Sequence, residues 1–356
     1  MNPAPPVPFS CTYTPNVPEL LLQLNCTLLI STYQAGKIIF ISPKDKERLV
    51  QLPRTFSKAM GVALHEDKMA IATMDEVIIL KNAPGLAPNY PRKPKVYDAF
   101  FVPRATYYTG RVDIHDLDWG TDGLWAINTS FSSLVKVDEE FSFTPVWQPP
   151  FISKLASEDR CHLNGLAMKD GKPKFVTALG SGDSRQSWRE NIVKGGVLMD
   201  VESSETILQG LAMPHSPRYY KGKLYALLSA IGQLICVDTD KGTYEVVKAM
   251  DAFVRGMVIY NDYAFIGTSK LRQNSSTFKD LEIAKKADFA GITIVHLPTA
   301  SLVGQIRYTN SVDEIYDIQL LPNILRPGIL NTATEDHKQS LSLPNATFWA
   351  RSLDKK

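Results

Sequence analysis

Residues Asp113–Ser130 read DIHDLDWGTDGLWAINTS, and the pattern in this stretch decides the fold. A histidine opens a short segment in which apolar and polar residues alternate. A Gly/Asp-rich turn follows, and the chain returns as a second, more apolar segment. Alternation with a period of two indicates a β-strand, and such a turn between two strands predicts an antiparallel hairpin. Similar histidine-led openings recur in residues 161–180 and 213–229, so the hairpin belongs to a repeat.

A unit of four predicted strands repeats along the chain. Each unit runs from a polar opening through a turn to an apolar strand, and its third strand often ends in Val-Asp. The middles of the six openings lie 39 to 61 residues apart, at Gly61, Leu117, Gly165, Pro217, Gly256 and Asp317. Four strands in about 40 to 50 residues are typical of one β-propeller blade. The sequence therefore predicts an all-β, six-bladed propeller with four-stranded antiparallel blades.

The alternative fold is a pair of β-sandwiches, which would need a linker near the middle, and no shift in composition marks one there. Two predicted strands precede the first opening. We expect them to complete the last blade, because closing the ring removes free sheet edges. These boundaries give an N-terminal extension (residues 1–26), a single propeller domain (27–331) and a polar tail (332–356) that is laid on the surface or disordered. Helical periodicity is confined to residues 15–25 and 277–291.

Composition favours a globular protein and excludes several classes of function. Hydrophobic residues make up 44% of the chain and charged residues 21%, and the formal net charge is +2. This balance gives no basic footprint for nucleic acid or for an anionic membrane. The chain shows no secretory pattern and no membrane-length apolar run, and its four cysteines form no CxxC pair. We therefore expect a cytoplasmic protein with reduced thiols.

Propeller geometry predicts where the polar openings meet. The first strand of each blade is innermost, so the starts of the first strands surround the mouth of the central channel. Alignment of the blades by their turns gives these matching residues: His115, Asn164, Ser216 and Arg255, with Met60 and approximately Tyr316 opposite. By strand alternation His162 points to the same side as Asn164, and His215 and Glu314 fall at a similar depth.

Three imidazoles with one open position are typical of a catalytic zinc site, and copper or iron also accepts such ligands. We expect His115, His162 and His215 to bind a divalent transition metal, with zinc preferred. Glu314 would serve as a general base or a fourth ligand. Arg255 would hold a carboxylate or phosphate of the substrate.

Further residues are predicted to support this site. Asn164 completes the catalytic group, and Asp113 and Asp116 would orient the imidazoles through their N–H groups. The loop 177–196 interrupts the strand pattern, so its tryptophan and neighbouring arginine would form a lid or a wall for the ligand. The predicted substrate-binding residues are Asp183, Trp188, Arg189, Arg218 and Lys270.

Structural roles are the alternative for each of these residues. A single buried histidine is often a satisfied core residue, and Trp188 could pack down its own loop. Arg255 could pair with Glu314 or Asp317 inside the channel, and polarity there could reflect hydration alone. His296, at a strand end, is expected to face solvent.

Several short motifs stand along the chain, among them STYQAGK (31–37), DRCHLNGLAM (159–168), MPHSPR (213–218) and DEIYDIQLLP (313–322). Through them the chain resembles an uncharacterised bacterial family known only as conserved hypothetical, whose members are sometimes fused to tetratricopeptide repeats or found near them. The resemblance covers roughly residues 27–328 and implies no established activity. The matching positions include His115, Asn128, His162, Asn164, Asp183, Trp188, Arg189, His215, Arg218, Arg255, Lys270, Arg272 and Glu314.

More distantly, the organisation is similar to six-bladed propellers of the gluconolactonase, regucalcin and strictosidine-synthase group. Several of those proteins hold one divalent metal at the channel mouth with Glu, Asn and Asp ligands. This sequence departs from that pattern by offering histidines, which suit a transition metal better than calcium. The similarity of fold does not assign the chemistry.

Two functions follow as hypotheses. The first is a metal-dependent enzyme of hydrolase, lactonase or isomerase type that acts on a small or peptide-borne substrate. The second is a non-catalytic interaction module or scaffold with a protein partner, because propellers offer broad faces and the resembling family is associated with tetratricopeptide repeats. Neither hypothesis involves nucleic acid or a membrane.

Overall fold

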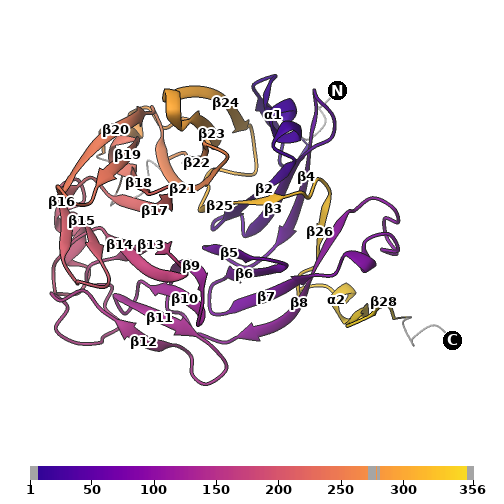
Figure 1. Cartoon of the computed structure of the whole chain (residues 1–356), viewed down its shortest axis with the longest axis horizontal. Helices are drawn as coiled ribbons and strands as arrows, with labels where there is room; N and C mark the ends of the chain where they lie inside the picture. The colour runs from indigo at the N-terminus through magenta and orange to yellow at the C-terminus, as the bar shows by residue number, and fades with distance from the viewer. Residues whose placement is uncertain (1–6, 272–277, 279–280, 351–356) are drawn as a thin grey trace, which may run out of the picture.

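Six antiparallel sheets stand in a ring, and their first strands lie nearest the common axis (Figure 1). The computed structural model describes residues 7–271, 278 and 281–350. In each sheet four strands follow one another from the axis outward, and neighbouring first strands contact each other around the ring. The molecule is therefore a six-bladed β-propeller with four-stranded blades, which confirms the fold predicted from the repeat.

Blades 1 to 3 are meanders of consecutive strands. Blade 1 contains β5 (Val62–His65), β6 (Lys68–Ala72), β7 (Val77–Asn82) and β8 (Ala99–Tyr107). Blade 2 contains β9 (Ile114–Gly120), β10 (Gly123–Asn128), β11 (Ser133–Val137) and β12 (Thr144–Trp147). Blade 3 contains β13 (Leu163–Lys169), β14 (Lys172–Ala178), β15 (Gly196–Asp200) and β16 (Thr206–Leu211).

Blades 4 and 5 continue the pattern, and blade 6 joins the two ends of the chain. Blade 4 contains β17 (Pro214–Tyr220), β18 (Lys223–Leu228), β19 (Gln233–Asp238) and β20 (Thr243–Ala249). Blade 5 contains β21 (Phe253–Tyr260), β22 (Tyr263–Ser269), β23 (Ala290–His296) and β24 (Ser301–Tyr308). Blade 6 contains β25 (Asp317–Pro322), β2 (Cys26–Thr32), β3 (Lys37–Pro43) and β4 (Leu49–Thr55).

The ring closes where β25 pairs with β2. The pairing is antiparallel and sets Ile318 opposite Ile30, so a first strand from near the C-terminus meets three strands from near the N-terminus. This arrangement confirms the predicted closure. The ring cannot open without breaking that ladder, and the positions of the first strands around the axis are fixed by it.

The hydrophobic core lies between the blades. Because each blade is covered on both faces by its neighbours, β3 has a continuous buried run from Ile38 to Ile41. Phe40 of blade 6 packs in one cluster with Ile71 and Leu80 of blade 1. Full burial of such a side chain stabilises the fold by roughly 1.5–3 kcal/mol. This packing holds the blades in fixed relative positions, and with them the residues at the channel mouth.

Short segments outside the blades cover sheet edges. β1 (Cys11–Tyr13) adds to the outer edge of blade 5, and β26 (Pro327–Ile329) pairs in parallel with β8. Helix α1 (Val17–Gln23) lies within the first predicted helix. In the second, the described helix is the short 3-10 helix η4 (Glu282–Lys285), and the last two residues already belong to β23. Residues 277, 279 and 280 of this span lie outside the described residues. The other 3-10 helices are η1 (Pro84–Leu86), η2 (Ser187–Asn191), η3 (Ser229–Ile231) and η5 (Leu297–Thr299).

The C-terminal tail is more ordered than its composition suggests. Trp349 accounts for this, because its ring packs against Tyr90 and Phe100, and its Nε1–H donates to the Leu86 carbonyl (3.0 Å). The tail is thereby attached beside blade 1, as Figure 1 shows. Its elements are α2 (Asp336–Gln339), β27 (Ser340–Leu343) and β28 (Ala346–Trp349).

The cysteines and the helices can be compared with the expectations of reduced thiols and of no membrane-length apolar run. All four cysteines are unpaired. Burial raises the pKa of Cys26 and Cys161 to about 12, so these two thiols stay protonated. In the part of the chain that the structure describes, no helix is long and apolar enough to cross a membrane.

Candidate functional site

A repeated hydrogen bond identifies equivalent residues in the blades. A hydroxyl near the end of a second strand donates to a carbonyl at the start of the next blade's first strand. Four pairs do so: Ser31 to Met60, Thr129 to Leu163, Ser229 to Val254 and Ser269 to Ile315. The four carbonyls are therefore equivalent, and so are the residues that follow them: Gly61, Asn164, Arg255 and Tyr316.

Blade 3 makes the same connection with a different donor. Leu179 stands where other blades have a hydroxyl, and the Nδ2 of Asn164 donates to the Pro214 carbonyl instead (3.1 Å). His215 follows Pro214, and His115 in blade 2 has the same contacts as His215. We call the six equivalent positions the mouth ring: Gly61, His115, Asn164, His215, Arg255 and Tyr316.

The mouth ring corrects the alignment drawn from sequence by one residue in blade 4. That alignment placed Ser216 in the ring, whereas the structure places His215 there. In blade 1 the accepting carbonyl of Met60 indicates Gly61, but the left-handed Lys58 (φ 50°) stands two positions before Met60, as His162 does before Asn164, and supports the predicted Met60. Ser216 has a left-handed backbone (φ 49°), and its hydroxyl accepts the N–H of Gly256 in blade 5 (3.0 Å). The pairing of β17 with β18 shifts just after His215, and a comparison of turns does not detect such a shift.

A cavity of about 580 Å³ opens at the mouth ring, which is an ordinary size for a small-molecule site. Four ring residues line it, together with residues two positions earlier, which stand at or just before the starts of the first strands. The loops after the second strands of blades 3, 5 and 6 complete the wall. The lining residues are Tyr33, Gln34, Asp113, His115, His162, Leu179, Trp188, Arg189, Met213, His215, Phe253, Arg255, Ser269, Lys270, Leu271, Phe278, Glu314 and Tyr316.

His115 is held by two partners at one ring nitrogen. Asp113 has a left-handed backbone (φ 58°), and its carbonyl lies 3.2 Å from Nδ1 of His115. The Thr129 hydroxyl lies 2.8 Å from the same nitrogen and donates its own proton to the Leu163 carbonyl (2.6 Å). Both partners of Nδ1 are therefore acceptors, so Nδ1 carries the proton and Nε2 of the neutral ring carries the lone pair.

His215 repeats this arrangement in blade 4. Met213 is also left-handed (φ 55°), and its carbonyl lies 3.1 Å from Nδ1 of His215. The Ser229 hydroxyl lies 2.9 Å from Nδ1 and donates to the Val254 carbonyl (2.6 Å). The same reasoning assigns the proton to Nδ1, so two blades present histidines in the same tautomer.

His162 reaches the pocket from a different position. It stands two residues before the mouth ring, with a left-handed backbone of its own (φ 52°). Its Nδ1 lies 2.9 Å from the Asp159 carboxylate, which also accepts the Nε1–H of Trp188 (3.0 Å). The ring lies 4.4 Å from the Trp188 ring and 4.7 Å edge-on from that of His115, measured between centroids. Its Nδ1 is therefore a donor as well.

Burial keeps two of the imidazoles neutral. It lowers the pKa of His115 and of His215 well below 6.5, and the positive field of Arg255 lowers both further. The Nε2 atom of each makes no hydrogen bond to a described residue and is not among the fully buried atoms without a partner. These two lone pairs therefore open onto the pocket that both rings line.

Arg255 of blade 5 and Tyr316 of blade 6 contact each other within the mouth ring. The guanidinium carbon lies 3.5 Å from the centroid of the Tyr316 ring. Gly256 (φ 76°) permits this approach, because a Cβ there would lie 2.8 Å from the Asp317 Cα. The Tyr316 hydroxyl is buried and has no hydrogen-bond partner among the described residues, and burial raises its pKa well above 10, so it stays protonated. Tyr33 stacks beside it, with 6.1 Å between ring centroids.

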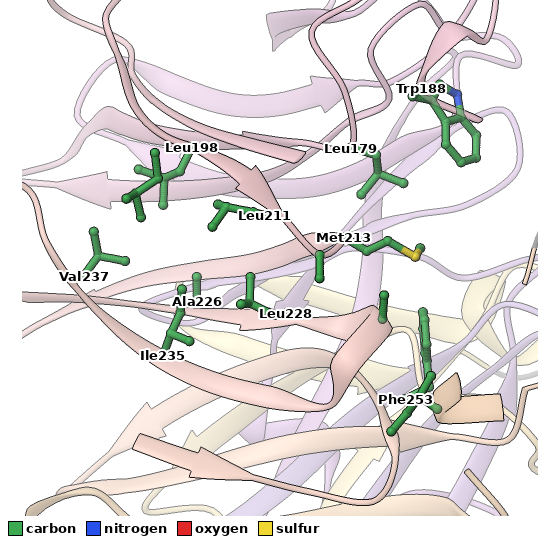
Figure 2. Packing of buried hydrophobic residues seen from close by; sticks show 14 of the residues in the cluster. Leu179, Trp188, Leu198, Leu211, Met213, Ala226, Leu228, Ile235, Val237 and Phe253 are labelled. Carbon is green, nitrogen blue, oxygen red and sulfur yellow. The ribbon is translucent and has the colours of Figure 1, made fainter. Parts of the chain in front are cut away.

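An apolar wall meets the pocket from the core between blades 3 and 4. Figure 2 shows Leu179, Trp188, Met213 and Phe253 at the end of this cluster that lies away from Val237. All four are packed in the core and also line the cavity. The wall is therefore fixed by the packing of the propeller itself.

Several predicted residues do reach the pocket. Trp188 is 3% exposed, so it is a packed wall residue, and the Arg189 guanidinium carbon lies 4.3 Å from its ring centroid. Lys270 and Glu314 line the cavity, and the amino group of Lys270 lies 3.0 Å from the Asp313 carboxylate.

Three predicted site residues lie elsewhere. Asn164 is occupied with connecting blades 3 and 4, since its Oδ1 accepts the Thr177 hydroxyl (2.7 Å). Asp183 holds its loop through hydrogen bonds from Ser153 and Arg160, which lower its pKa to about 2. Arg218 stands further along β17 and pairs with the carboxylates of Asp116 and Asp317. None of the three lines the pocket.

Sequence reasoning found Trp188 but missed the rest of the apolar wall, Leu179, Met213 and Phe253, and the role of Tyr33. Met213 and Phe253 stand two positions before the mouth ring, so a correct alignment of the blades would have found them. Arg272, one of the motif positions, lies outside the described residues. Within the described ranges, no group of three His, Cys, Asp or Glu side chains is already arranged to hold a metal ion.

Comparisons with known proteins place the chain in a family without assigning an activity. The model of a family described as "Domain of unknown function (DUF4915)" matches residues 15–330. No curated protein matches the sequence. Among solved structures, a chain of the "Crystal structure of Nidogen/Laminin Complex" is similar, with a TM-score of 0.49, 9% identity and coverage of 84% of this chain and 99% of that chain. That likeness is too distant to carry an argument about function.

Proposed function

The chain belongs to the DUF4915 family of domains of unknown function, and from its channel mouth we propose that it is a metal-dependent enzyme. One observation carries the proposal: three imidazoles donate Nδ1–H to fixed acceptors and line one pocket, which leaves Nε2 of each for a ligand. Metal-ligating histidines are commonly oriented in this way by a carbonyl or a carboxylate. His115, His162 and His215 would hold a divalent transition metal, zinc before copper or iron.

The neighbouring residues suit the conversion of a small substrate. A bound metal would supply a Lewis acid for a substrate oxygen. Glu314 lines the same pocket and would take up a proton at its carboxylate. Arg255 would hold a carboxylate or phosphate of the substrate in place. This set favours hydrolysis, lactone opening or isomerisation of a small or peptide-borne substrate.

A second candidate is a small-ligand site that works without a metal. One observation favours it, namely that the described residues contain no triad of His, Cys, Asp or Glu side chains arranged for metal binding. The lone pairs of His115 and His215 would then accept hydrogen bonds or protons directly from the ligand.

Metal binding to the full chain separates the two candidates. We expect the purified protein to contain a transition metal or to take up zinc, with a rise in melting temperature. Zinc at about 100 times its dissociation constant stabilises a folded protein by about 2.7 kcal/mol. His162→Ala and His215→Ala should each abolish that response.

His296→Ala is the matched control. Its Nδ1 lies 2.9 Å from the Thr299 hydroxyl, and it does not line the pocket, so this variant should keep the full response to zinc. A metal-free protein whose melting temperature ignores zinc, copper and iron would rule out the metal and leave the second candidate.

A further inference from the structure

We infer that the pocket takes a small amphipathic anion, in which a carboxylate or phosphate group is joined to an apolar body. The inference rests on the pocket of the proposed function and names the chemical class of its substrate, but it holds with or without a metal. Arg255 with Tyr316 accounts for the anion, and the apolar wall accounts for the rest of the molecule.

Arg255 has the contacts of an anion site. Its guanidinium stacks on the Tyr316 ring at 3.5 Å, so one face is used while the N–H groups, which lie in the guanidinium plane, are not. It forms no ion pair or hydrogen bond with the described residues, and it lines the pocket. Arg160 has the opposite situation, because Glu158 and Asp183 both pair with it. An arginine left without a carboxylate in a pocket is suited to bind one from a ligand.

The charges around the pocket agree with an anionic ligand. Three cationic side chains line it, Arg189, Arg255 and Lys270, against two carboxylates, Asp113 and Glu314. The buried imidazoles add no negative charge. Among the described lining residues the balance is therefore positive by one charge, and Arg255, the guanidinium within the mouth ring, pairs with no described carboxylate.

Tyr316 supports Arg255 through its ring rather than through its hydroxyl. The residue is 5% exposed, and its hydroxyl has no hydrogen-bond partner among the described residues. Because this oxygen is fully buried, it does not open onto the pocket, so the part of Tyr316 that serves the anion site is the ring on which Arg255 stacks. This is the only lining residue of the pocket whose buried polar atom lacks a partner in the described part of the chain.

The apolar wall explains why a bare anion would leave the pocket unfilled. Trp188, Met213 and Phe253 present hydrocarbon to the same cavity, and Figure 2 shows them at one end of the core cluster. Trp188 is also fixed by its hydrogen bond to Asp159, so the wall is preorganised. A cavity of about 580 Å³ accommodates a drug-sized molecule, whereas phosphate or acetate would fill only a small part of it.

Calorimetric titration of the full chain with five probes tests the inference. The probes are phenylacetate, phenyl phosphate, the uncharged phenylacetamide, acetate and inorganic phosphate. We expect one or both phenyl anions to bind about 10- to 100-fold more tightly than phenylacetamide, because hydrogen bonds to a charged group are lost in the amide. The bare anions should also bind at least about tenfold more weakly, because they leave the apolar wall empty. The preferred phenyl anion distinguishes a carboxylate from a phosphate substrate.

Two arginine variants complete the test. Arg255→Met should lower affinity for the phenyl anion about 10- to 100-fold and bring it to that of the amide. Arg307→Met is the control, since Arg307 also stacks on an aromatic ring (4.1 Å from the Phe289 centroid) but does not line the pocket. Equal binding of anion and amide, or an Arg255→Met variant that binds as tightly as the parent, would overturn the inference.

The outcome is distinguishable from that of the metal proposal. Selective anion binding by a protein that ignores added metals supports this inference and rejects the metal. Metal binding with no preference for the phenyl anion does the reverse.

Discussion

Two groups of polar side chains lie along the propeller axis, and they are built in opposite ways. In the channel interior, Arg218 of blade 4 lies 3.0 Å from Asp116 of blade 2 and 3.5 Å from Asp317 of blade 6. Its remaining N–H groups donate to the carbonyls of Leu166 in blade 3 and Met257 in blade 5. One guanidinium thus connects its own blade to four others, and all three of its nitrogens donate to groups of the protein.

The channel mouth also contains arginine and other polar side chains, but the protein does not supply partners for all of their polar atoms. Arg255 stacks on Tyr316 and pairs with no described carboxylate. His115 and His215 use one nitrogen for the protein and leave the other to the pocket. Polar groups on the axis are therefore structural where neighbouring blades satisfy them, and they are candidates for function where the blades leave them to a cavity.

Removal of the interior guanidinium should give the largest effect. Arg218→Met leaves the buried carboxylates of Asp116 and Asp317 without their counter-charge, and we expect a loss of about 3–5 kcal/mol in the free energy of unfolding. Urea unfolding followed by circular dichroism measures it. The exposed Arg307→Met should stay within about 0.5 kcal/mol of the parent. A loss of less than about 1 kcal/mol for Arg218→Met would show that the interior network is not structural.

The sequence predicted the ring because its signals are local. Alternation and Gly/Asp turns mark every hairpin, and the repeat length indicates four strands per unit. Ring closure follows because two predicted strands precede the first opening and can complete the last blade. The gathering of His115, His162 and His215 follows from propeller geometry, because all three stand at or directly before the starts of first strands.

The remaining features depend on contacts between blades, which a single sequence does not display. The left-handed Ser216 shifts the alignment by one residue. Asn164 is structural because Leu179 lacks a hydroxyl, and the two residues come from β13 and from the loop after β14. Arg218 stands on a first strand like the site residues, but its long side chain reaches Asp116 and Asp317 across the axis. Strand position therefore predicted which residues face the channel, and only the packing separates interior from mouth.

The imidazoles should make stability depend on pH, with a smaller effect. The folded-state pKa of His215 lies well below 6.5, chiefly because of burial, so below about pH 6.5 the unfolded chain binds a proton that the folded chain does not. Stability is therefore complete above pH 6.5 and falls as the pH drops toward the folded-state pKa. The contribution is at most about 1.4 kcal/mol per pH unit for each such histidine.

His215→Gln should remove that contribution. Between pH 7 and 5 the variant should lose less unfolding free energy than the parent, by up to the slope given above, in urea titrations at each pH. His296→Gln changes an imidazole outside the pocket and should leave the slope as it is in the parent. Parallel pH profiles for His215→Gln and the parent would mean that His215 is not held neutral by the fold.

The smallest effect on stability is expected where the effect on binding is largest. Arg255→Met replaces a stacked guanidinium by a side chain that also packs on Tyr316, and no described carboxylate is left unpaired. A cation–π contact at a partly exposed site contributes about 0.5–1 kcal/mol, and burial of the methionine offsets part of it. We therefore expect urea unfolding of Arg255→Met to lie within about 1 kcal/mol of the parent. Replacement of arginine by methionine would then lower the free energy of unfolding in the interior and the ligand affinity at the mouth. A loss of about 3 kcal/mol in the unfolding free energy of Arg255→Met would instead show that the mouth is a second structural network.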